Sequence, residues 1–239
     1  MALFNHIKLL AGSAIADPLQ FLTRINFFCP VCSYAGHFLS FGKPPQRYAL
    51  CPRCYSLERD RLYAHFFEDQ HNPVSGKDIV HFAPEPGLYK LITEHYKPRS
   101  YITADPTPDI AELREDMTAL SFDNNSLDII IANHVLEHIA DDRTAMAECY
   151  RVLRDGGQFW VTVPVVEAWT RTYETPIVTT PEERERHYGR YDHCRVYGRD
   201  LVTRLEDAGF AVTRYCASPA ACLESSISYG ETIFVAVKE

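Results

Sequence analysis

The sequence predicts an α/β protein in which a doubly wound, mostly parallel sheet is preceded by a small metal-stabilised ribbon. Two observations carry this prediction. Strand and helix signals alternate along residues 57–239, and such alternation favours parallel strands joined by right-handed crossovers, with helices on both faces of the sheet. Before this region, four cysteines form two C-x-x-C motifs. A chain of 239 residues can bury the core that such a sheet requires.

The ribbon prediction rests on Cys29, Cys32, Cys51 and Cys54. Each C-x-x-C motif can present two thiolates to one face of a tight turn, and two such turns complete a tetrahedral zinc site. Because cysteine occupies all four ligand positions, we expect a structural rather than a catalytic metal. A pair of disulfides is one alternative. A redox dithiol is the other, and it would need a thioredoxin-like βαβ setting. We therefore expect a zinc ribbon over residues 27–56.

Apolar residues in the rest of the chain recur with the periods of helices and strands. The clearest strand is residues 127–132, LDIIIA, and the clearest helix is residues 141–153. Ligands of open α/β sheets bind at the carboxyl ends of the strands, so polar residues there are candidate site residues. The other expected elements are helices at residues 56–71, 87–96 and 201–208, and strands at residues 79–82, 100–104, 157–163, 210–217 and 231–239.

The charge balance argues against a nucleic-acid platform. The net charge is −8, whereas phosphate binding needs clustered Lys and Arg. Residues 1–65 hold seven Lys or Arg and three acids, a surplus of +4 that leaves −12 for the rest of the chain. This basic front on an acidic body indicates two modules and makes a nucleic-acid partner unlikely.

Residues 1–26 are expected to form a helical segment, because Leu3, Phe4 and Ile7 fall at helical spacing. A signal peptide is the alternative, since Lys8 precedes the small apolar run LLAGSAIA. No stretch of the sequence reaches the roughly 20 apolar residues that span a bilayer. We expect a cytoplasmic protein without a membrane partner, in which the four remaining cysteines are free thiols.

Acidic residues follow the second expected strand. Asp105 closes that strand about 20 residues after the turn that ends the first, the interval at which a carboxylate can bind both hydroxyls of a ribose. Asp116 and Met117 come next and could bracket an adenine. A strand can end in aspartate for other reasons, so Asp105 alone is a weak indication.

The stretch from Asp116 to Val165 resembles class I S-adenosylmethionine-dependent methyltransferases, in particular those of type 11. It contains LDIIIANHVLEH, which fits the signature D-x-I-x-x-x-x-V-L-E-H. YITAD, which ends at Asp105, is similar to the family's acidic second strand, and RVLRDGGQFWVTVP to the approach to its fifth. The resemblance implies a Rossmann-like, seven-stranded methyltransferase domain over residues 57–239, with S-adenosylmethionine as cofactor.

The resemblance also implies roles for single residues. Asp105 would hold the ribose, Asp116 and Met117 would flank the adenine, and Asn133 and His134 would lie near the methionine moiety. The first loop, HFAPEPG, departs from the family's glycine-rich turn. In this loop we expect cofactor contacts from Ala83, Pro84, Glu85 and Gly87, with Glu85 accepting from the cofactor's ammonium group.

The run from His134 to His138 also fits H-x-x-E-H, the inverted zinc-protease pattern. That pattern requires both histidines on one long helix, whereas His134 directly follows an expected strand. We interpret His138 instead as a residue close to the cofactor or acceptor cleft, with a capped structural histidine as the alternative.

Residues 165–198 form an unusually long connection, which is typical of a lid or binding segment. If the methyl acceptor is a hydroxyl, a base must remove its proton, and His193 is our first candidate, followed by His187 and His138. A solvated charged loop is the alternative. The residues expected to bind the acceptor are Tyr188, Arg190, Tyr191 and Arg195.

Taken together, the sequence predicts methyl transfer from S-adenosylmethionine to a small-molecule acceptor, with a hydroxyl as the expected target. Two other classes stay open. The first is an RNA methyltransferase that grips nucleic acid with its basic ribbon. The second is a methyltransferase fold that has lost catalysis and serves as a binding module, which the missing glycines of the first loop would favour.

Overall fold

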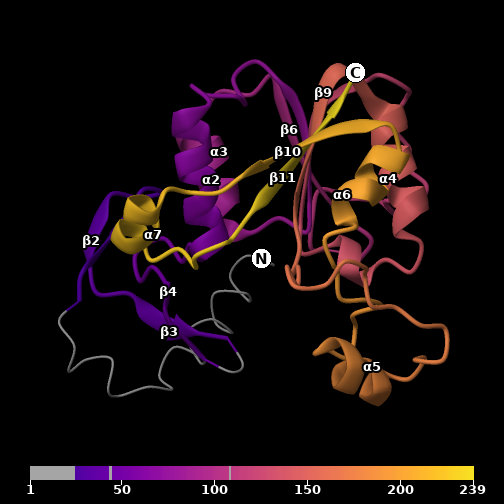
Figure 1. The fold of residues 1–239 in the computed structure, drawn as a ribbon. Coiled ribbons are helices and arrows are strands. Elements are labelled where there is room, and N and C mark those ends of the chain that lie inside the picture. Colours follow the sequence, from indigo (N-terminus) through magenta and orange to yellow (C-terminus); the bar gives the residue numbers. More distant parts are fainter. Residues whose placement is uncertain (1–24, 43–44, 108) are drawn as a thin grey trace. The chain divides into compact units, whose positions relative to one another are not determined.

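The structure is a computed structural model that describes residues 25–42, 45–107 and 109–239 (Figure 1). The helix expected over residues 1–26 lies almost wholly outside these ranges. Within them the chain forms two compact units. The cysteine unit comprises the described residues up to 76 together with residues 84–98 and 215–232, and the sheet unit comprises the described residues of 77–83, 99–214 and 233–239.

The sheet unit contains a seven-stranded sheet in the order β10-β11-β9-β8-β5-β6-β7. β5 pairs in parallel with β6 and β8, β8 with β9, and β6 with β7, whereas β11 is antiparallel to β9. This confirms the predicted doubly wound, mostly parallel sheet. The strands are β5 (Asp78–Phe82), β6 (Ser100–Asp105), β7 (Leu113–Arg114), β8 (Leu127–Asn133), β9 (Leu153–Thr162), β10 (Phe210–Tyr215) and β11 (Ile233–Lys238).

The central strand β8 shows why the sequence forms this sheet. From Ile129 to Asn133 every side chain is buried, so both faces of the strand are covered. A continuous run of apolar residues is what a central parallel strand requires. The amide of Asn133 closes this run, and its Oδ1 accepts a hydrogen bond of 3.0 Å from the Thr162 hydroxyl at the end of β9.

Helices α4 (Asp142–Val152) and α6 (Leu201–Asp207) of the sheet unit bury apolar residues in one core with the strands. α4 begins where expected, because the side chain of Asp141 accepts from the amide of Thr144. α5 (Pro181–Tyr188) lies in the segment expected to be a loop. Thr180 and Glu183 form a reciprocal capping box at its start. This capping signal was overlooked in the sequence; Figure 1 shows α5 standing away from the sheet.

The cysteine unit contains two antiparallel strand pairs. β1 pairs with β2 and β3 pairs with β4, both antiparallel. Its elements are β1 (Phe27–Cys29), β2 (Tyr34–Gly36), β3 (Leu39–Phe41), β4 (Gln46–Leu50), α2 (Glu58–Asp69), α3 (Pro86–His95) and α7 (Pro219–Ser225). α7 was not predicted.

Arg61 of α2 connects several segments of the cysteine unit. Its side chain is fully buried, and its guanidinium donates to the carbonyls of Ala49, Ser56, Ser225 and Ser226 at 2.6–3.0 Å. These carbonyls come from β4, from Ser56 between the second cysteine motif and α2, and from the C-terminal end of α7. A single side chain thus joins β4, α2 and the end of α7 within the cysteine unit.

The prolines and the glycine of the first loop, HFAPEPG, are explained by the start of α3. Glu85 is the residue before α3, and Pro86 is the first residue of that helix, where a missing N–H costs nothing and the fixed φ favours helix formation. Gly87 is required by packing, since a β-carbon there would collide with Asp60 and would lie 2.9 Å from the Cα of Ser56. The proline-rich turn is therefore a helix start.

Within the described ranges, no helix is both long and apolar enough to cross a bilayer.

Candidate active site

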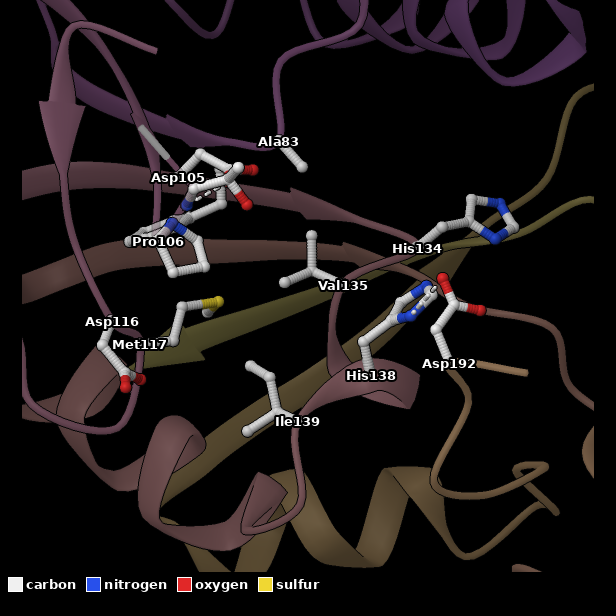
Figure 2. Close-up of a pocket in the computed structure, with 12 residues that line it drawn as sticks. Ala83, Asp105, Pro106, Asp116, Met117, His134, Val135, His138, Ile139 and Asp192 are labelled. Atoms are coloured by element: carbon white, nitrogen blue, oxygen red, sulfur yellow. Dashed lines mark hydrogen bonds and ion pairs between the residues drawn. The ribbon is translucent and has the colours of Figure 1, made fainter. Parts of the chain in front are cut away.

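A cavity of about 380 Å³ lies in the sheet unit, at the carboxyl ends of β5, β6 and β8 (Figure 2). Parallel strands present their carboxyl ends at one edge, so the residues that follow each strand converge there. The cavity is lined by Phe82, Ala83, Asp105, Pro106, Thr107, Asp116, Met117, His134, Val135, His138, Ile139 and Asp192.

The acidic end of the cavity is formed by residues after β6. Asp105 is buried, and its Oδ1 accepts a hydrogen bond of 2.7 Å from the amide of Thr107, which fixes the carboxylate at the strand end. Asp116 accepts from the amide and the hydroxyl of Thr118, both at 2.8 Å. Figure 2 shows both carboxylates and the Met117 sulfur on the same side of the cavity. The structure thus brings together the three residues expected to bind a nucleoside.

The backbone at two strand ends is strained. Ala83 after β5 and His134 after β8 have φ of 47° and 52°, in the left-handed region that side-chain-bearing residues avoid at a cost of about 1–3 kcal/mol. Each amide still pairs across the sheet, Ala83 with the carbonyl of Ala104 at 2.9 Å and His134 with that of Thr162 at 2.8 Å. The chain therefore turns sharply one residue beyond each strand, and both turning residues line the cavity.

Histidines gather at the opposite end. The rings of His138 and His193 meet edge to face with centroids 4.7 Å apart. Nδ1 of His138 lies 3.5 Å from Oδ2 of Asp192. His138 and Asp192 line the cavity, whereas His193 is buried and does not line it. Figure 2 shows His134, His138 and Asp192 grouped across the cavity from Asp105 and Asp116.

Glu137 completes this cluster. Its side chain is only 2% exposed, and neither of its carboxylate oxygens has a hydrogen-bond partner among the described residues. Nδ1 of His134 lies 3.2 Å from Oε1, close enough for an ion pair but without hydrogen-bond geometry. Burial lowers the pKa of His193, and Glu137 opposes that shift. A neutral His193 is able to accept a proton or bind a cation.

The three predicted catalytic histidines do not all lie together. His138 and His193 are neighbours, whereas His187 lies on α5, where its Nδ1 is 2.8 Å from the hydroxyl of Tyr173. His187 does not line the cavity. The Asp192 carboxylate, adjacent in sequence to His193, pairs with His138 instead.

The residues expected to bind the acceptor are mostly engaged within the protein. Tyr188 is buried, and its hydroxyl accepts from the amide of Thr175. Arg190 pairs with Asp192, and Tyr191 is exposed. None of these three lines the cavity.

Arg195, which was expected to bind the acceptor, is engaged within the protein. Its side chain is 4% exposed. It donates to Glu174 and to the carbonyls that follow β8, those of Leu136, Ile139 and Ala140. Arg195 therefore holds the turn that carries Glu137 and His138.

In the first loop, Pro84, Glu85 and Gly87 belong to the cysteine unit. Oε1 of Glu85 accepts a hydrogen bond of 2.7 Å from Nε of Arg59 on α2. The carboxylate that was expected to bind an ammonium group is thus already paired with a guanidinium. Asn133 is buried and bonded to Thr162, and it does not line the cavity.

The four predicted metal ligands converge in the cysteine unit. Sγ of Cys29 lies 3.6 Å from that of Cys54, and Sγ of Cys32 lies 3.7 Å from that of Cys51. All four sulfurs lie within 4.8 Å of one another. Thiolates bound to one tetrahedral zinc ion at about 2.3 Å stand about 3.8 Å apart. The cluster thus has the size of a four-thiolate zinc site.

Comparisons with known proteins agree with this fold. Residues 69–161 match the family model described as a methyltransferase domain. An uncharacterised 37.1 kDa protein from a transposon of Streptomyces fradiae is 35% identical over 98 residues, which are 41% of this chain and 28% of that protein. A probable S-adenosylmethionine-dependent methyltransferase of Mycolicibacterium smegmatis is 28% identical over 97 residues, 41% of this chain and 34% of that protein. The match thus spans about a third of each relative's length.

Solved structures share the architecture at low identity. An S-adenosylmethionine-dependent methyltransferase from Mesorhizobium loti has a TM-score of 0.53 at 13% identity, over 74% of this chain and 98% of that one. The [4+2]-cyclase SpnF has a TM-score of 0.55 at 15% identity, over 78% and 84% of the two chains. The chain therefore has the Rossmann-like fold of class I S-adenosylmethionine-dependent methyltransferases, and its residues 69–161 match the methyltransferase domain family.

Proposed function

We propose that this protein transfers a methyl group from S-adenosylmethionine to a hydroxyl of a small-molecule acceptor. One observation carries the proposal. A single cavity in a methyltransferase fold has two carboxylates and a methionine at one end, and a histidine with a partner carboxylate at the other. This polarity suits a nucleoside-containing cofactor at the first end and a proton-losing acceptor at the second.

Asp105 and Asp116 are the residues that would hold the cofactor. The second oxygen of Asp105 is available for the ribose hydroxyls, since Oδ1 is bound to the Thr107 amide. Met117 is buried at the cavity wall and offers an apolar, polarisable surface for an adenine. When bound, S-adenosylmethionine supplies a methyl group already activated by a positively charged sulfur, so the protein's task is alignment and exclusion of water.

His138 is the residue best placed to act on the acceptor. It lines the cavity, and Asp192 faces its Nδ1, which would orient the ring and stabilise the imidazolium formed when it takes a proton. His193 contacts His138 from behind and supports it. This revises the order of candidates drawn from the sequence, in which His193 came first.

A labelling experiment tests the proposal. The purified protein is incubated with S-adenosylmethionine carrying an isotopically labelled methyl group and a panel of phenols and other hydroxylated metabolites. We expect label on oxygen in at least one product, and loss of labelling in His138→Ala with retained binding of S-adenosylhomocysteine. Label found only on nitrogen or carbon would reject the hydroxyl as target, and failure of the parent to bind the cofactor product would reject methyl transfer itself.

We also propose that Cys29, Cys32, Cys51 and Cys54 hold one structural zinc ion. Three of the four are buried and the fourth is half-buried, so no position is open to an acceptor. Burial raises the pKa of the Cys32 thiol to about 12, and four thiolates therefore need a cation to coexist. Elemental analysis should find one zinc per chain, and a metal-free protein with the same stability would contradict the assignment.

A further inference from the structure

The cluster formed by Glu137, His138 and His193, the histidine–glutamate cluster, combines three metal-ligating groups outside the four-cysteine site. One ligand atom from each residue lies within 4.8 Å of the others. Glu137 and His138 belong to the 3₁₀ turn η2 (Leu136–His138) after β8. His193 comes from the long insertion, which is the connection of residues 165–198. Two distant segments thus bring a carboxylate and two imidazoles to one point.

The state of Glu137 indicates that something is bound at this point. Both of its oxygens are buried and have no hydrogen-bond partner among the described residues. An unpaired buried carboxylate costs several kcal/mol. Arg195, which is bonded to the same turn, gives its donors to Glu174 and to backbone carbonyls. His134 is within ion-pair distance of Oε1 only, and only if it is protonated. The carboxylate therefore faces the two imidazoles without a compensating charge.

We propose that the histidine–glutamate cluster binds one divalent transition-metal cation at the edge of the cavity. Two imidazoles and one carboxylate form a donor set that suits ions such as Mn²⁺, Fe²⁺, Co²⁺ and Zn²⁺. Three protein ligands leave coordination positions open, as catalytic sites require. His138 lines the cavity, so an open position would face the acceptor.

Asp192 fits this arrangement as a partner of a ligand. A histidine bound to metal through one ring nitrogen usually gives the N–H of the other to a carboxylate, which fixes its orientation. Oδ2 of Asp192 lies 3.5 Å from Nδ1 of His138, and Arg190 holds both oxygens of Asp192 at 3.2 Å. Nε2 of His138 is thereby left for the cation.

The role of the cation rests on the proposed function, although its binding does not. In the metal-bound protein, His138 acts as a ligand through Nε2 in place of accepting the proton itself. A hydroxyl coordinated to the divalent cation has a lowered pKa and loses its proton to solvent more readily. Acceptors with two neighbouring oxygens, such as catechols or hydroxy acids, would occupy two open positions and be held in place by them. We therefore infer a bidentate oxygen acceptor as the substrate class of this site.

Metal titration tests the inference. The zinc-loaded protein is titrated with Mn²⁺, which thiolates bind weakly, and free Mn²⁺ is followed by electron paramagnetic resonance. We expect one Mn²⁺ per chain, with affinity lowered at least about tenfold in both Glu137→Gln and His138→Gln. Matched controls are Glu206→Gln and His95→Gln, which change exposed residues outside the cluster and should bind Mn²⁺ like the parent.

Two results would overturn the metal site: no Mn²⁺ or Co²⁺ binding at millimolar concentration, or equal affinity in the parent and the cluster variants. Because His138→Gln alters a half-buried residue, it guards against a folding defect in Glu137→Gln. Binding of S-adenosylhomocysteine is measured in the same samples. If the protein binds S-adenosylhomocysteine but not Mn²⁺, only the metal site is rejected. If it binds Mn²⁺ but not S-adenosylhomocysteine, the proposed function is rejected.

Discussion

Oδ2 of Asp192 lies 3.5 Å from Nδ1 of His138, although the two residues come from separate segments, the long insertion and the turn after β8. Arg195, three residues beyond Asp192, is bonded to the carbonyls on both sides of this turn. The segment of residues 165–198 therefore fixes the turn that carries His138 and supplies the carboxylate that faces it.

Replacing His138 should lower the rate of methyl transfer without changing the affinity for the cofactor product. We expect His138→Gln to lower the turnover of methyl transfer by about 10²-fold or more, because the residue faces the acceptor end of the cavity. Its affinity for S-adenosylhomocysteine should stay within about twofold of the parent. Single-turnover assays on an acceptor from the labelling panel measure the first quantity. His95→Gln provides the control, and a His138 variant with parental turnover would refute the role.

Arg61 should determine the stability of the cysteine unit. Arg61→Lys cannot span four carbonyls, and each buried acceptor left without a donor costs about 1–3 kcal/mol. We expect a loss of about 3 kcal/mol or more in the free energy of unfolding, together with easier release of zinc. Arg53→Lys, in which the side chain is exposed, is the matched control. Equal stability of the two variants in urea denaturation would contradict this account.

Loss of the metal should unfold the ribbon. Cys32→Ser leaves three thiolates for the zinc ion, and structural zinc contributes directly to the free energy of folding. We expect this variant to bind less than half of the parental zinc and to expose the cysteine unit to proteolysis. Cys216→Ser, which removes an exposed thiol outside the cluster, should behave like the parent. Full zinc retention in Cys32→Ser would argue against four-cysteine ligation.

Asp60 should make the stability pH-dependent. Its Oδ2 accepts from the amide of Leu57 at 2.8 Å, while Oδ1 has no partner among the described residues. Burial first, and then repulsion from Glu85, raise the pKa of Asp60 to about 7. An unfolded aspartate has a pKa of about 3.9. Between these values the folded chain binds more protons than the unfolded chain, so this carboxyl stabilises the protein at low pH, and the contribution is lost as pH rises through about 7.

Asp60→Asn keeps an acceptor for the Leu57 amide and removes the titration. The free energy of unfolding of the parent should therefore fall relative to that of the variant between about pH 4 and about pH 7, and the difference should stay constant above about pH 8. Urea denaturation at several pH values measures this difference. A difference that stays constant, or that changes in favour of the parent, would show that Asp60 is ionised in the folded protein throughout.

The elements that apolar periodicity specifies were predictable from the sequence. β8 is a continuous buried run and α4 has an amphipathic pattern with an aspartate cap, so both strand and helix were placed within two residues. Asp105 could be placed at the end of β6 from the sequence, because the apolar strand stops there. The positions of Asp116 and Met117 beside it depend on β7 (Leu113–Arg114), which was not predicted. α5 is polar on most sides and has no apolar stripe, so apolar periodicity could not predict it. Its capping box was the one local sequence signal for this helix.

The rest depends on tertiary contacts that no local pattern encodes. Glu85 pairs with Arg59, and Arg195 with carbonyls after β8, although both read in sequence as exposed charges. The left-handed backbone of Ala83 and His134 is likewise not visible in the sequence, since alanine rarely adopts it and histidine adopts it in only a few per cent of cases. The partnership of His138 with Asp192 arises only when the insertion folds back over the strand end.

The central claim is that Asp105 holds the cofactor of a methyltransferase, and isothermal titration calorimetry with S-adenosylhomocysteine tests it most directly. The parent should bind one molecule per chain. Asp105→Ala should bind at least about tenfold more weakly, because charged hydrogen bonds contribute about 1.5–3 kcal/mol. Asp155→Ala, which removes an exposed carboxylate on β9, should bind with the affinity of the parent. Absence of binding by the parent, or equal affinity of the parent and Asp105→Ala, would contradict the account.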